Sequence, residues 1–505
     1  MSSPTYLLDK ETEKDIEKDG AFTTSSTASV HSLAKDEVKI EVSDPNIVDW
    51  DGPDDPQNPL NWPNSRRWGS VAVVSGITFL TPLGSAIFAP GVDLVMDEFH
   101  SHSDLLSGFV VSVYVLGFAF GPLTIAPMSE MYGRLPLYHI CMTLFVICNI
   151  ACALSTSLNM LIVFRFLAGT FGAAPLTLGG GTIADVMPAS QRAKAMSVWV
   201  LGPTFGPVLG PICGGFISQN IGWRWNFWIL SIAAGVGTLL GFLLMKETYA
   251  PTLLDRKTKR LRKETGNMNL RSKLDMGLTP RDLFWFSIVR PTKLLLFSPI
   301  VLFLSIYVAI TYAYLYLFFT TISDVFANQY HFKKELVGLS FLGLGVGQFA
   351  GQFVYSYFAT KSYNSHVKKG GFKPEHRLET MIFGAIIIPI ALFWYGWAVQ
   401  AKTQWMNPEV ATFFFSLGML FIWMPANVYL IDVYTVYAAS AMAANTVLRS
   451  LAAAILPLAG PKMYAKLGYG WGNSLLGFIA LFLLPIPLIF MKYGERMRTQ
   501  STLKL

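Results

Sequence analysis

The clearest pattern in this chain is the alternation of long apolar runs with short polar segments. A helix of roughly 20 residues spans the hydrocarbon core of a membrane, and the apolar runs have about this length. About six of them fall in each half of the chain. They cover residues 68–90, 105–127, 136–154, 159–185, 194–217, 225–245, 293–320, 335–359, 378–399, 410–431, 436–460 and 472–492. The pattern predicts an all-α membrane protein with about twelve spanning helices.

The polar segments separate two bundles and leave a tail at each end. We expect a largely disordered tail over 1–67, a bundle of about six helices over 68–246 and a basic central loop over 247–292. A second bundle of about six helices follows over 293–492, with a short tail over 493–505. Two such bundles around a central loop are typical of secondary transporters. The tails and the loop are too polar to form a folded domain outside the membrane.

Basic residues gather on one side of the predicted spans. Residues 247–292 hold ten Lys and Arg against five Asp and Glu, and the segment 361–377 is also basic. The segment 91–104 falls on the other side and carries acidic residues but neither Lys nor Arg. Loops rich in Lys and Arg stay in the cytoplasm. The pattern therefore predicts that both chain ends and the central loop are cytoplasmic.

The composition agrees with a membrane protein and argues against several other classes. Hydrophobic residues make up 52% and charged residues 14% of the chain, whereas soluble domains carry roughly 25% charged residues. The net charge of +7 follows from the cytoplasmic loops and gives no reason to expect a nucleic-acid partner. The four cysteines lie in apolar runs and suggest neither a disulfide framework nor a metal site. No nucleophile–histidine–acid set and no ATP-binding loop stands out, so we predict no enzyme and no catalytic residue.

A charged turn follows the second apolar run. Glu130 and Arg134 flank Gly133, whose backbone freedom suits a tight turn between two spans. Asp185 lies at the cytoplasmic end of the run 159–185. A guanidinium between two carboxylates can hold helices together, so we predict that the three charged residues form a conformational latch. The alternative is an ordinary charged turn, which short cytoplasmic loops often contain.

Arg165 lies inside the apolar run 159–185. Placing an arginine within a membrane span costs about 2.5–3.5 kcal/mol, so such a residue normally faces a cavity or a partner group. The alternative is that its side chain reaches back to the membrane surface. We favour the first interpretation, because Arg165 lies several residues inside the run.

The run 194–217 carries glycines at i, i+4 spacing together with prolines. Small residues allow another helix to approach closely, and prolines interrupt the hydrogen-bond ladder of the helix. The residues concerned are Gly202, Gly206, Pro207, Gly210, Pro211, Gly214 and Gly215. We predict a hinge surface that slides against a helix of the opposite half. The alternative is tight packing without motion.

A candidate substrate cavity is marked by aromatic residues with a few polar groups, a combination that suits amphipathic ligands. The candidates lie in apolar runs of the second half and are Tyr307, Tyr312, Tyr316, Trp423, Asn427, Asn445 and Arg449. Aromatic residues also gather at membrane interfaces, which is the alternative interpretation. Arg165 and Arg449 would favour anionic ligands such as organic acids.

Together these features resemble the major facilitator superfamily and, within it, the fungal drug:proton antiporters with twelve spans. The turn from Glu130 to Arg134 resembles the signature of the superfamily, although Leu135 stands where that signature has a second basic residue. Arg165 matches the arginine that the family links to proton coupling. The glycine and proline run resembles the signature that separates antiporters from symporters, and it is the most specific of these matches.

The resemblance implies a monomeric transporter of the plasma membrane that exports drugs, toxins or secondary metabolites in exchange for protons. Its partners would be a small-molecule substrate, protons and the lipid bilayer, and export of this kind contributes to multidrug resistance. A proton gradient would supply the work, so we expect no cofactor and no metal. The alternatives are an exporter of organic acid anions, a proton-coupled uptake symporter and, least favoured, a membrane receptor that transports nothing.

Overall fold

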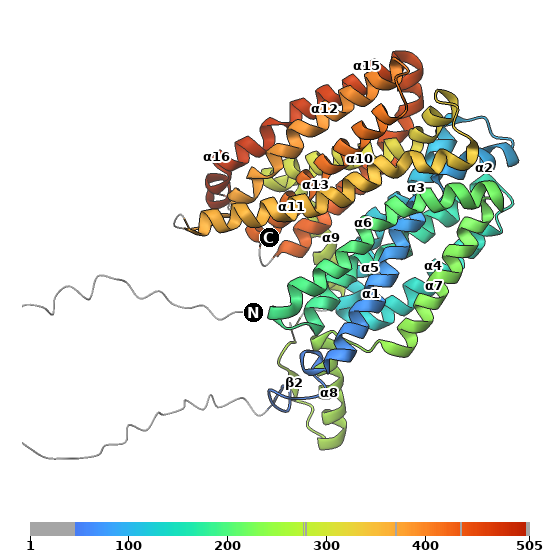
Figure 1. The fold of residues 1–505 in the computed structure, drawn as a ribbon. Coiled ribbons are helices and arrows are strands. Elements are labelled where there is room, and N and C mark those ends of the chain that lie inside the picture. The colour runs from blue at the N-terminus through green and yellow to red at the C-terminus, as the bar shows by residue number, and fades with distance from the viewer. Residues whose placement is uncertain (1–45, 276, 278–279, 369–370, 435–436, 501–505) are drawn as a thin grey trace, which may run out of the picture. The chain divides into compact units, whose positions relative to one another are not determined.

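The computed structural model describes residues 46–275, 277, 280–368, 371–434 and 437–500. Most of the predicted tail, residues 1–45, and the last residues 501–505 lie outside the described part of the chain. Within that part, long helices dominate and a single pair of very short strands accompanies them (Figure 1). The predicted all-α membrane fold is confirmed.

The first half of the fold consists of long helices joined by short turns. They are α1 (Asn64–Ala86), α2 (Val92–Glu98), α3 (Asp104–Tyr132), α4 (Arg134–Ala153), α5 (Leu158–Val186), α6 (Ala189–Asn220) and α7 (Arg224–Leu244). Serine hydroxyls cap two of these helices. Ser103 Oγ accepts the N–H of Leu106 at 3.4 Å, and Ser157 Oγ accepts the N–H of Met160 at 3.3 Å. Gly133, with φ of 98°, allows the chain to turn directly from α3 into α4.

The second half repeats this organisation, with 3₁₀ segments leading into several helices. The helices are α10 (Pro299–Asn328), α11 (Leu342–Lys368), α12 (Met381–Gln400), α13 (Met406–Tyr434), α14 (Ala438–Ile455), α15 (Gly460–Leu483) and α16 (Pro485–Gln500). The 3₁₀ segments are η3 (Lys334–Phe341), η4 (Pro374–Glu379) and η6 (Leu456–Ala459). Neighbouring helices pack closely, α10 against α14 and α13 against both α11 and α12.

Eleven segments of the described residues are long and apolar enough to cross a membrane. The last of them runs from Ala438 to Arg498 over 61 residues. As one helix it would measure about 90 Å, three times the roughly 30 Å of a bilayer core. Gly468, with φ of 70° and ψ of 173°, breaks α15 and divides this segment into two spans. Eleven segments, one of them divided, give the twelve spans that the sequence predicted.

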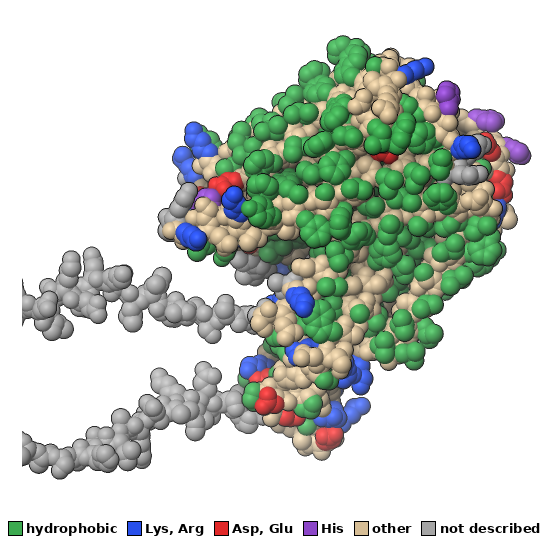
Figure 2. All heavy atoms as spheres, in the orientation of Figure 1, with side chains coloured by type: hydrophobic (Ala, Val, Ile, Leu, Met, Phe, Trp, Pro, Cys, Tyr) green, Lys and Arg blue, Asp and Glu red, His purple; other side chains and the backbone are tan. Residues whose placement is uncertain are grey.

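The helices present apolar side chains to their surroundings. Ile232 and Phe482, for example, are 61% and 81% exposed. Figure 2 shows apolar side chains over the visible sides of the helices, whereas charged side chains gather toward the helix ends. Exposed apolar surface of this extent is unfavourable in water and favourable in lipid. The protein is therefore a multi-pass membrane protein.

The charged segments outside the spans are partly folded. Lys257 is buried, and its ammonium group lies 2.6 Å from a carboxylate oxygen of Asp51 and 3.7 Å from one of Asp55. The segment before α1 and the central loop therefore contain ordered elements, because each supplies charged partners for the other. The segment before α1 contributes the strand β1 (Ile47–Val48). The central loop contributes the helices α8 (Ala250–Thr265) and α9 (Pro280–Phe297) and the strand β2 (Arg271–Ser272), which pairs in parallel with β1.

The two halves meet at the end of the helices that carries α2, which we call the α2 face; the opposite end carries α8 and is called the α8 face. Ser112 Oγ of α3 donates to the carbonyl oxygen of Ala454 in α14 at 2.9 Å. Gly215 of α6 lies against Gly338 of η3. These contacts come from the helix turns nearest α2. The halves are therefore closed against each other at the α2 face.

Candidate functional site

Arg165 lies in α5 with only 1% of the residue exposed. Its Nε donates to the carbonyl oxygen of Val110 at 2.7 Å, and its Nη2 lies 3.4 Å from the carbonyl oxygens of Ser85 and Val111. Its Nη1 has no hydrogen-bond partner within the described residues. The side chain therefore points into the protein, and the alternative that it reaches the membrane surface is wrong.

Aromatic rings, and not a carboxylate, surround the guanidinium of Arg165. Its Cζ lies 4.8 Å from the ring centroid of Phe88, 5.4 Å from that of Tyr114 and 5.7 Å from that of Phe227. Cation–π attraction offsets part of the cost of burying the charge. No carboxylate pairs with Arg165 in the described part of the chain. The role of Arg165 in proton coupling stays a prediction.

Ser85 connects the surroundings of Arg165 to the second half. Its Oγ donates to the carbonyl oxygen of Pro82 at 2.7 Å and lies 3.1 Å from the hydroxyl oxygen of Tyr316 in α10. Because the serine proton is already used, the tyrosine donates and the serine accepts. A direct hydrogen bond therefore joins α1 to α10 across the boundary between the halves.

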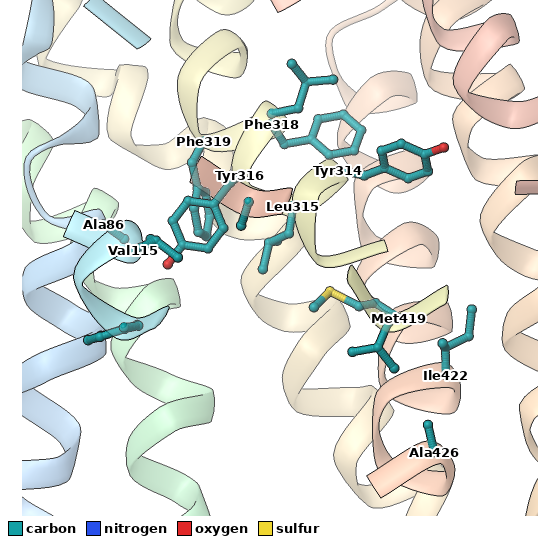
Figure 3. Packing of buried hydrophobic residues seen from close by; sticks show 14 of the residues in the cluster. Ala86, Val115, Tyr314, Leu315, Tyr316, Phe318, Phe319, Met419, Ile422 and Ala426 are labelled. Carbon is teal, nitrogen blue, oxygen red and sulfur yellow. The ribbon is translucent and has the colours of Figure 1, made fainter. Parts of the chain in front are cut away.

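The side chains of α10 are divided between the two halves. Figure 3 shows Tyr316 directed toward Ala86 and Val115 of the first half, whereas Tyr314 points away from them. The hydroxyl of Tyr314 donates to the carbonyl oxygen of Leu476 at 3.0 Å, within the second half. Tyrosines two positions apart on one helix thus serve different interfaces.

Tyr312, Trp423 and Arg449, which were predicted to line the cavity, lie together. The Cζ of Arg449 lies 4.5 Å from the ring centroid of Tyr312 and 5.7 Å from that of Trp423. The ring centroids of Tyr312 and Tyr316 are 5.3 Å apart. Each of these three residues sits about 16 to 20 Å along its helix from the α8 face, near the middle of a roughly 30 Å bilayer core. We call Tyr312, Trp423 and Arg449 the Arg449 cluster.

The remaining predicted cavity residues divide into two groups. Asn445 lies one turn before Arg449 on α14, and its Nδ2 donates to Oδ1 of Asn427 at 2.8 Å. Tyr307 is buried in the apolar core of the second half, more than a turn from Tyr312 along α10. The structure therefore brings the asparagines next to the Arg449 cluster and does not bring Tyr307 there.

The three residues of the predicted latch are gathered at the α8 face. Arg134 Nε lies 2.6 Å from Oδ2 of Asp185, and the Glu130 carboxylate is within electrostatic range of Arg134 and of Arg290 in α9. The Cζ of Arg290 lies 5.8 Å from the ring centroid of Tyr437, the residue before α14. The structure brings these residues together, and their function as a latch stays a prediction.

Glu247 takes part in the same cluster and was not predicted as a site residue. Its buried carboxylate accepts the N–H groups of Arg134 at 3.0 Å and of Leu135 at 3.3 Å. It also accepts those of Thr248 and Tyr249, each at 3.0 Å. Glu247 thus satisfies backbone donors at the start of α4, which have no partner inside the helix. A carboxylate bound by several N–H groups fixes the turn between α3 and α4 against the end of α7.

Tyr249 covers the guanidinium of Arg134. Its ring centroid lies 4.9 Å from the Cζ of Arg134. Burial and the neighbouring carboxylate of Glu130 raise the pKa of Tyr249 to about 12. The tyrosine is therefore neutral at physiological pH and shields the ion pair of Arg134 and Asp185 from water.

The glycine stripe of α6 packs against α1, in the same half. A Cβ atom at Gly206 would lie 2.7 Å from the backbone nitrogen of Leu83, and one at Gly210 would lie 2.9 Å from that of Ile87. Gly202 meets the backbone of α1 in the same way. The prediction that this stripe faces the opposite half is therefore wrong. The glycines allow the two helices to touch along their backbones.

Gly215 is the glycine of the predicted hinge that faces the opposite half, and Pro211 lies beside it. A Cβ atom at Gly215 would lie 2.9 Å from Cα of Gly338 in η3, and one at Gly338 would lie 2.8 Å from the carbonyl oxygen of Pro211. Pro207 and Pro211 lie inside α6, which continues through both of them as one helix. Farther from the α2 face, Val208 of α6 lies against Gly345 of α11, and the ring centroids of Phe205 and Phe349 are 5.0 Å apart. The halves therefore approach each other through α6 from its middle to its end at the α2 face.

Glu409 is a second carboxylate that was not predicted as a site residue. It is buried at the start of α13, where its Oε2 accepts the N–H of Gly343 at 3.1 Å and lies 3.3 Å from Oγ1 of Thr412. It lies in the first turn of α13 and directly before the predicted apolar run 410–431, where a charged residue is common, so the hydropathy pattern alone gives little sign of it. Within the described ranges, no group of three or more His, Cys, Asp or Glu side chains is placed to hold a metal ion.

Comparison with known sequences gives a consistent result. The family model described as Major Facilitator Superfamily matches residues 74–457. The MFS-type transporter penM of Penicillium rubens is 56% identical over 460 residues, which are 91% of this chain and 91% of that protein. The efflux pump radE of Floropilus chiversii is 53% identical over 464 residues, which are 91% of this chain and 86% of that protein.

Comparison with solved structures shows the same fold. The partially occluded inward-open conformation of the xylose transporter XylE from E. coli has a TM-score of 0.63 at 18% identity, covering 85% of this chain and 98% of that one. A POT family transporter in complex with a thioalcohol-conjugated peptide has a TM-score of 0.65 at 13% identity, covering 85% and 96%. At these identities the likeness establishes the arrangement of helices and nothing about substrates.

Proposed function

Because the chain belongs to the major facilitator superfamily, we propose that it exports small organic molecules from the cell in exchange for protons. The two halves tilt against each other and open a central site alternately to the α8 face and to the α2 face. Since Lys and Arg are concentrated in the segments at the α8 face, that face is cytoplasmic and the α2 face is extracellular. The membrane is the plasma membrane.

The observation that carries this proposal is a continuous set of contacts from Arg165 to Arg449. Nη2 of Arg165 lies 3.4 Å from the carbonyl oxygen of Ser85, and Ser85 Oγ lies 3.1 Å from the hydroxyl of Tyr316. The ring centroid of Tyr316 is 5.3 Å from that of Tyr312, which lies 4.5 Å from the Cζ of Arg449. An event at Arg165 can therefore act on the Arg449 cluster and on the closure of the α2 face together. Coupled exchange of a proton for a substrate requires a linkage of this kind.

Export, and not uptake, is supported by two independent points. A relative that is 53% identical is named an efflux pump. The glycine and proline run of α6 resembles the signature of antiporters, in which proton and substrate move in opposite directions. An outward transporter that uses the inward proton gradient needs no nucleotide.

The proposed direction of exchange can be tested in inside-out membrane vesicles that have an acidic lumen. A pH-sensitive dye in the lumen would report protons leaving as a test compound from a panel of planar aromatic molecules enters. For an antiporter, the acidic lumen drives uptake of the compound, and a protonophore abolishes that uptake. For a symporter the same gradient drives the compound out of the vesicles, which would contradict the proposal. Vesicles that carry Arg165→Ala protein at an equal level provide the control for leakage.

A further inference from the structure

Two nitrogen donors of the Arg449 cluster have no acceptor in the protein. Nε of Arg449 and Nε1 of Trp423 are both buried, and neither has a hydrogen-bond partner within the described residues. Both nitrogens carry a hydrogen and can only donate. Because nearly all buried donors in proteins find an acceptor, two unmatched donors in one cluster indicate an acceptor that is supplied from outside the protein.

The charge of Arg449 indicates which kind of acceptor is missing. The guanidinium contacts the ring faces of Tyr312 and Trp423, and no carboxylate forms an ion pair with it in the described part of the chain. The helix α14 packs against α10 and α13 and against α3 of the first half, so Arg449 belongs to an internal helix. A cation at mid-membrane depth in the protein interior calls for an anion.

Asn445 and its partner Asn427 indicate a second property that the ligand must have. Asn445 lies four residues before Arg449, so the two side chains share one face of α14. Its Nδ2 donates to Asn427, whereas its Oδ1 is buried without a partner within the described residues. This oxygen can only accept a hydrogen bond. A ligand that satisfies the whole face therefore needs an anionic acceptor together with a hydroxyl donor.

We infer that the Arg449 cluster binds the acidic group of a planar, hydroxylated aromatic acid. The guanidinium of Arg449 and the indole N–H of Trp423 donate to the carboxylate oxygens of the ligand. The ring of Tyr312 packs on the aromatic body of the ligand, and Asn445 Oδ1 accepts its hydroxyl. This inference rests on the proposed function in one respect, namely that the Arg449 cluster is the substrate site. It names the class of substrate that the site selects.

Equilibrium binding tests this inference without any proton gradient. The full-length protein in lipid nanodiscs would be titrated by calorimetry with 6-hydroxy-2-naphthoate and, separately, with its neutral amide, 6-hydroxy-2-naphthamide. We expect the acid to bind at least about tenfold more tightly than the amide, because only the acid supplies a charge-assisted acceptor. Arg449→Gln should reduce this ratio to about one. Arg260→Gln, at an exposed position of α8, provides the matched control and should leave the ratio unchanged.

A second variant separates the hydrogen bond from the packing. Trp423→Phe keeps an aromatic ring and loses the N–H, so it should weaken binding of the acid about three- to tenfold and leave binding of the amide unchanged. Equal affinities for acid and amide, no saturable binding of the acid at millimolar concentration, or a preference that survives Arg449→Gln would each overturn the inference. If Arg449→Gln does not fold, the effect of Trp423→Phe on binding of the acid and of the amide tests the inference by itself. A preference for the acid without proton exchange in vesicles would contradict the proposed function and leave this inference standing.

Discussion

The hydroxyl oxygens of Ser85 and Tyr316 lie 3.1 Å apart and join α1 to α10 across the boundary between the two halves. Both residues are almost completely buried, with 0% and 1% of their surface exposed. A hydrogen bond in this place must break whenever the α2 face opens. It therefore contributes to the free energy that keeps this face closed.

Replacing Tyr316 by phenylalanine should shift the protein toward the state that is open at the α2 face. The change removes the hydrogen bond to Ser85 and keeps the ring, so the closed state should lose about 0.5–1.5 kcal/mol, equivalent to a roughly two- to tenfold shift in populations. A cysteine introduced at Ser107, which lines a small hollow between the halves at this face, should react correspondingly faster with a water-soluble maleimide. The measurement uses a chain in which the exposed Cys213 is replaced by serine.

Tyr314→Phe is the matched control for this shift. Its hydroxyl bonds to Leu476 within the second half, so its loss should lower stability without changing the labelling rate at Ser107. Equal acceleration by both substitutions would show that the bond between Ser85 and Tyr316 has no particular part in closing the α2 face.

Two glycines of α6 should respond differently to the same substitution. Gly210→Leu places a side chain against the backbone of α1, so thermal stability and transport should fall together, with a loss of about 1–3 kcal/mol or more. Gly215→Leu places it against Gly338 of the opposite half, so the melting temperature should change little while exchange stops. Both quantities would be measured on the same purified samples. A Gly210→Leu protein of normal stability that fails to transport would favour the hinge interpretation of the stripe after all.

Glu247 should contribute more to stability than its place outside the spans suggests. Glu247→Ala leaves the N–H groups of Arg134 and Leu135 without an acceptor, and we expect a loss of about 1–3 kcal/mol in the free energy of unfolding. Glu247→Gln keeps one acceptor oxygen and should cost less. Thermal unfolding in detergent would measure both changes. Glu264→Ala, at an exposed position of α8, should be nearly neutral, and an effect as large as that of Glu247→Ala would contradict this explanation.

The contact between the segment 46–62 and α8 should weaken in acid. Burial raises the pKa of Asp55, but the N–H groups of Asp51 and Gln57 and the ammonium of Lys257 outweigh it, so the pKa lies below the ordinary 3.8. A carboxyl with a lowered pKa stabilises the fold fully above its unfolded pKa, and this contribution is lost as the pH falls through the folded value. The protection of the 46–62 amides against exchange, relative to the intrinsic exchange rate at each pH, should therefore stay constant down to about pH 4 and fall below it.

Asp55→Asn separates this titration from general acid unfolding. The amide cannot ionise, so the protection of 46–62 should be lower already at pH 7, and its further loss below pH 4 should be smaller. A wild-type profile that is flat between pH 6 and pH 3, or an unchanged profile in the variant, would show that Asp55 does not hold this segment.

The number and positions of the spans could be predicted because they depend on local properties. A run of about 20 apolar residues must be helical in lipid, whatever its neighbours are, since every backbone donor and acceptor needs a partner within the helix. The burial of Arg165 followed from the same argument, because a charge inside such a run must find polar groups in the protein. The sequence named Tyr312, Trp423 and Arg449 as candidate cavity residues but did not show that they lie together. It named Tyr307 as a candidate on the same grounds, although Tyr307 lies elsewhere.

Other features depend on which surfaces meet, and periodicity does not show this. The spacing of Gly206 and Gly210 indicates that they share a helix face, yet α1 and a helix of the second half would make equally good partners for it. Glu247 and Arg134 are more than 100 residues apart in sequence, and Lys257 and Asp51 are more than 200 apart. Nothing local marks these pairs, because each member alone resembles an ordinary charge in a loop.

The sequence by itself determined that this protein is a bundle of twelve membrane spans with an internal arginine, because hydrophobic length and the cost of burying charge act on each segment separately. Only the tertiary structure decided that the glycine face of α6 belongs to α1, that Ser85 and Tyr316 join the two halves, and that Arg449 meets aromatic rings without meeting a carboxylate. The physical reason is that packing and ion pairing are properties of two surfaces together. Their partners are selected by the fold as a whole and not by either segment alone.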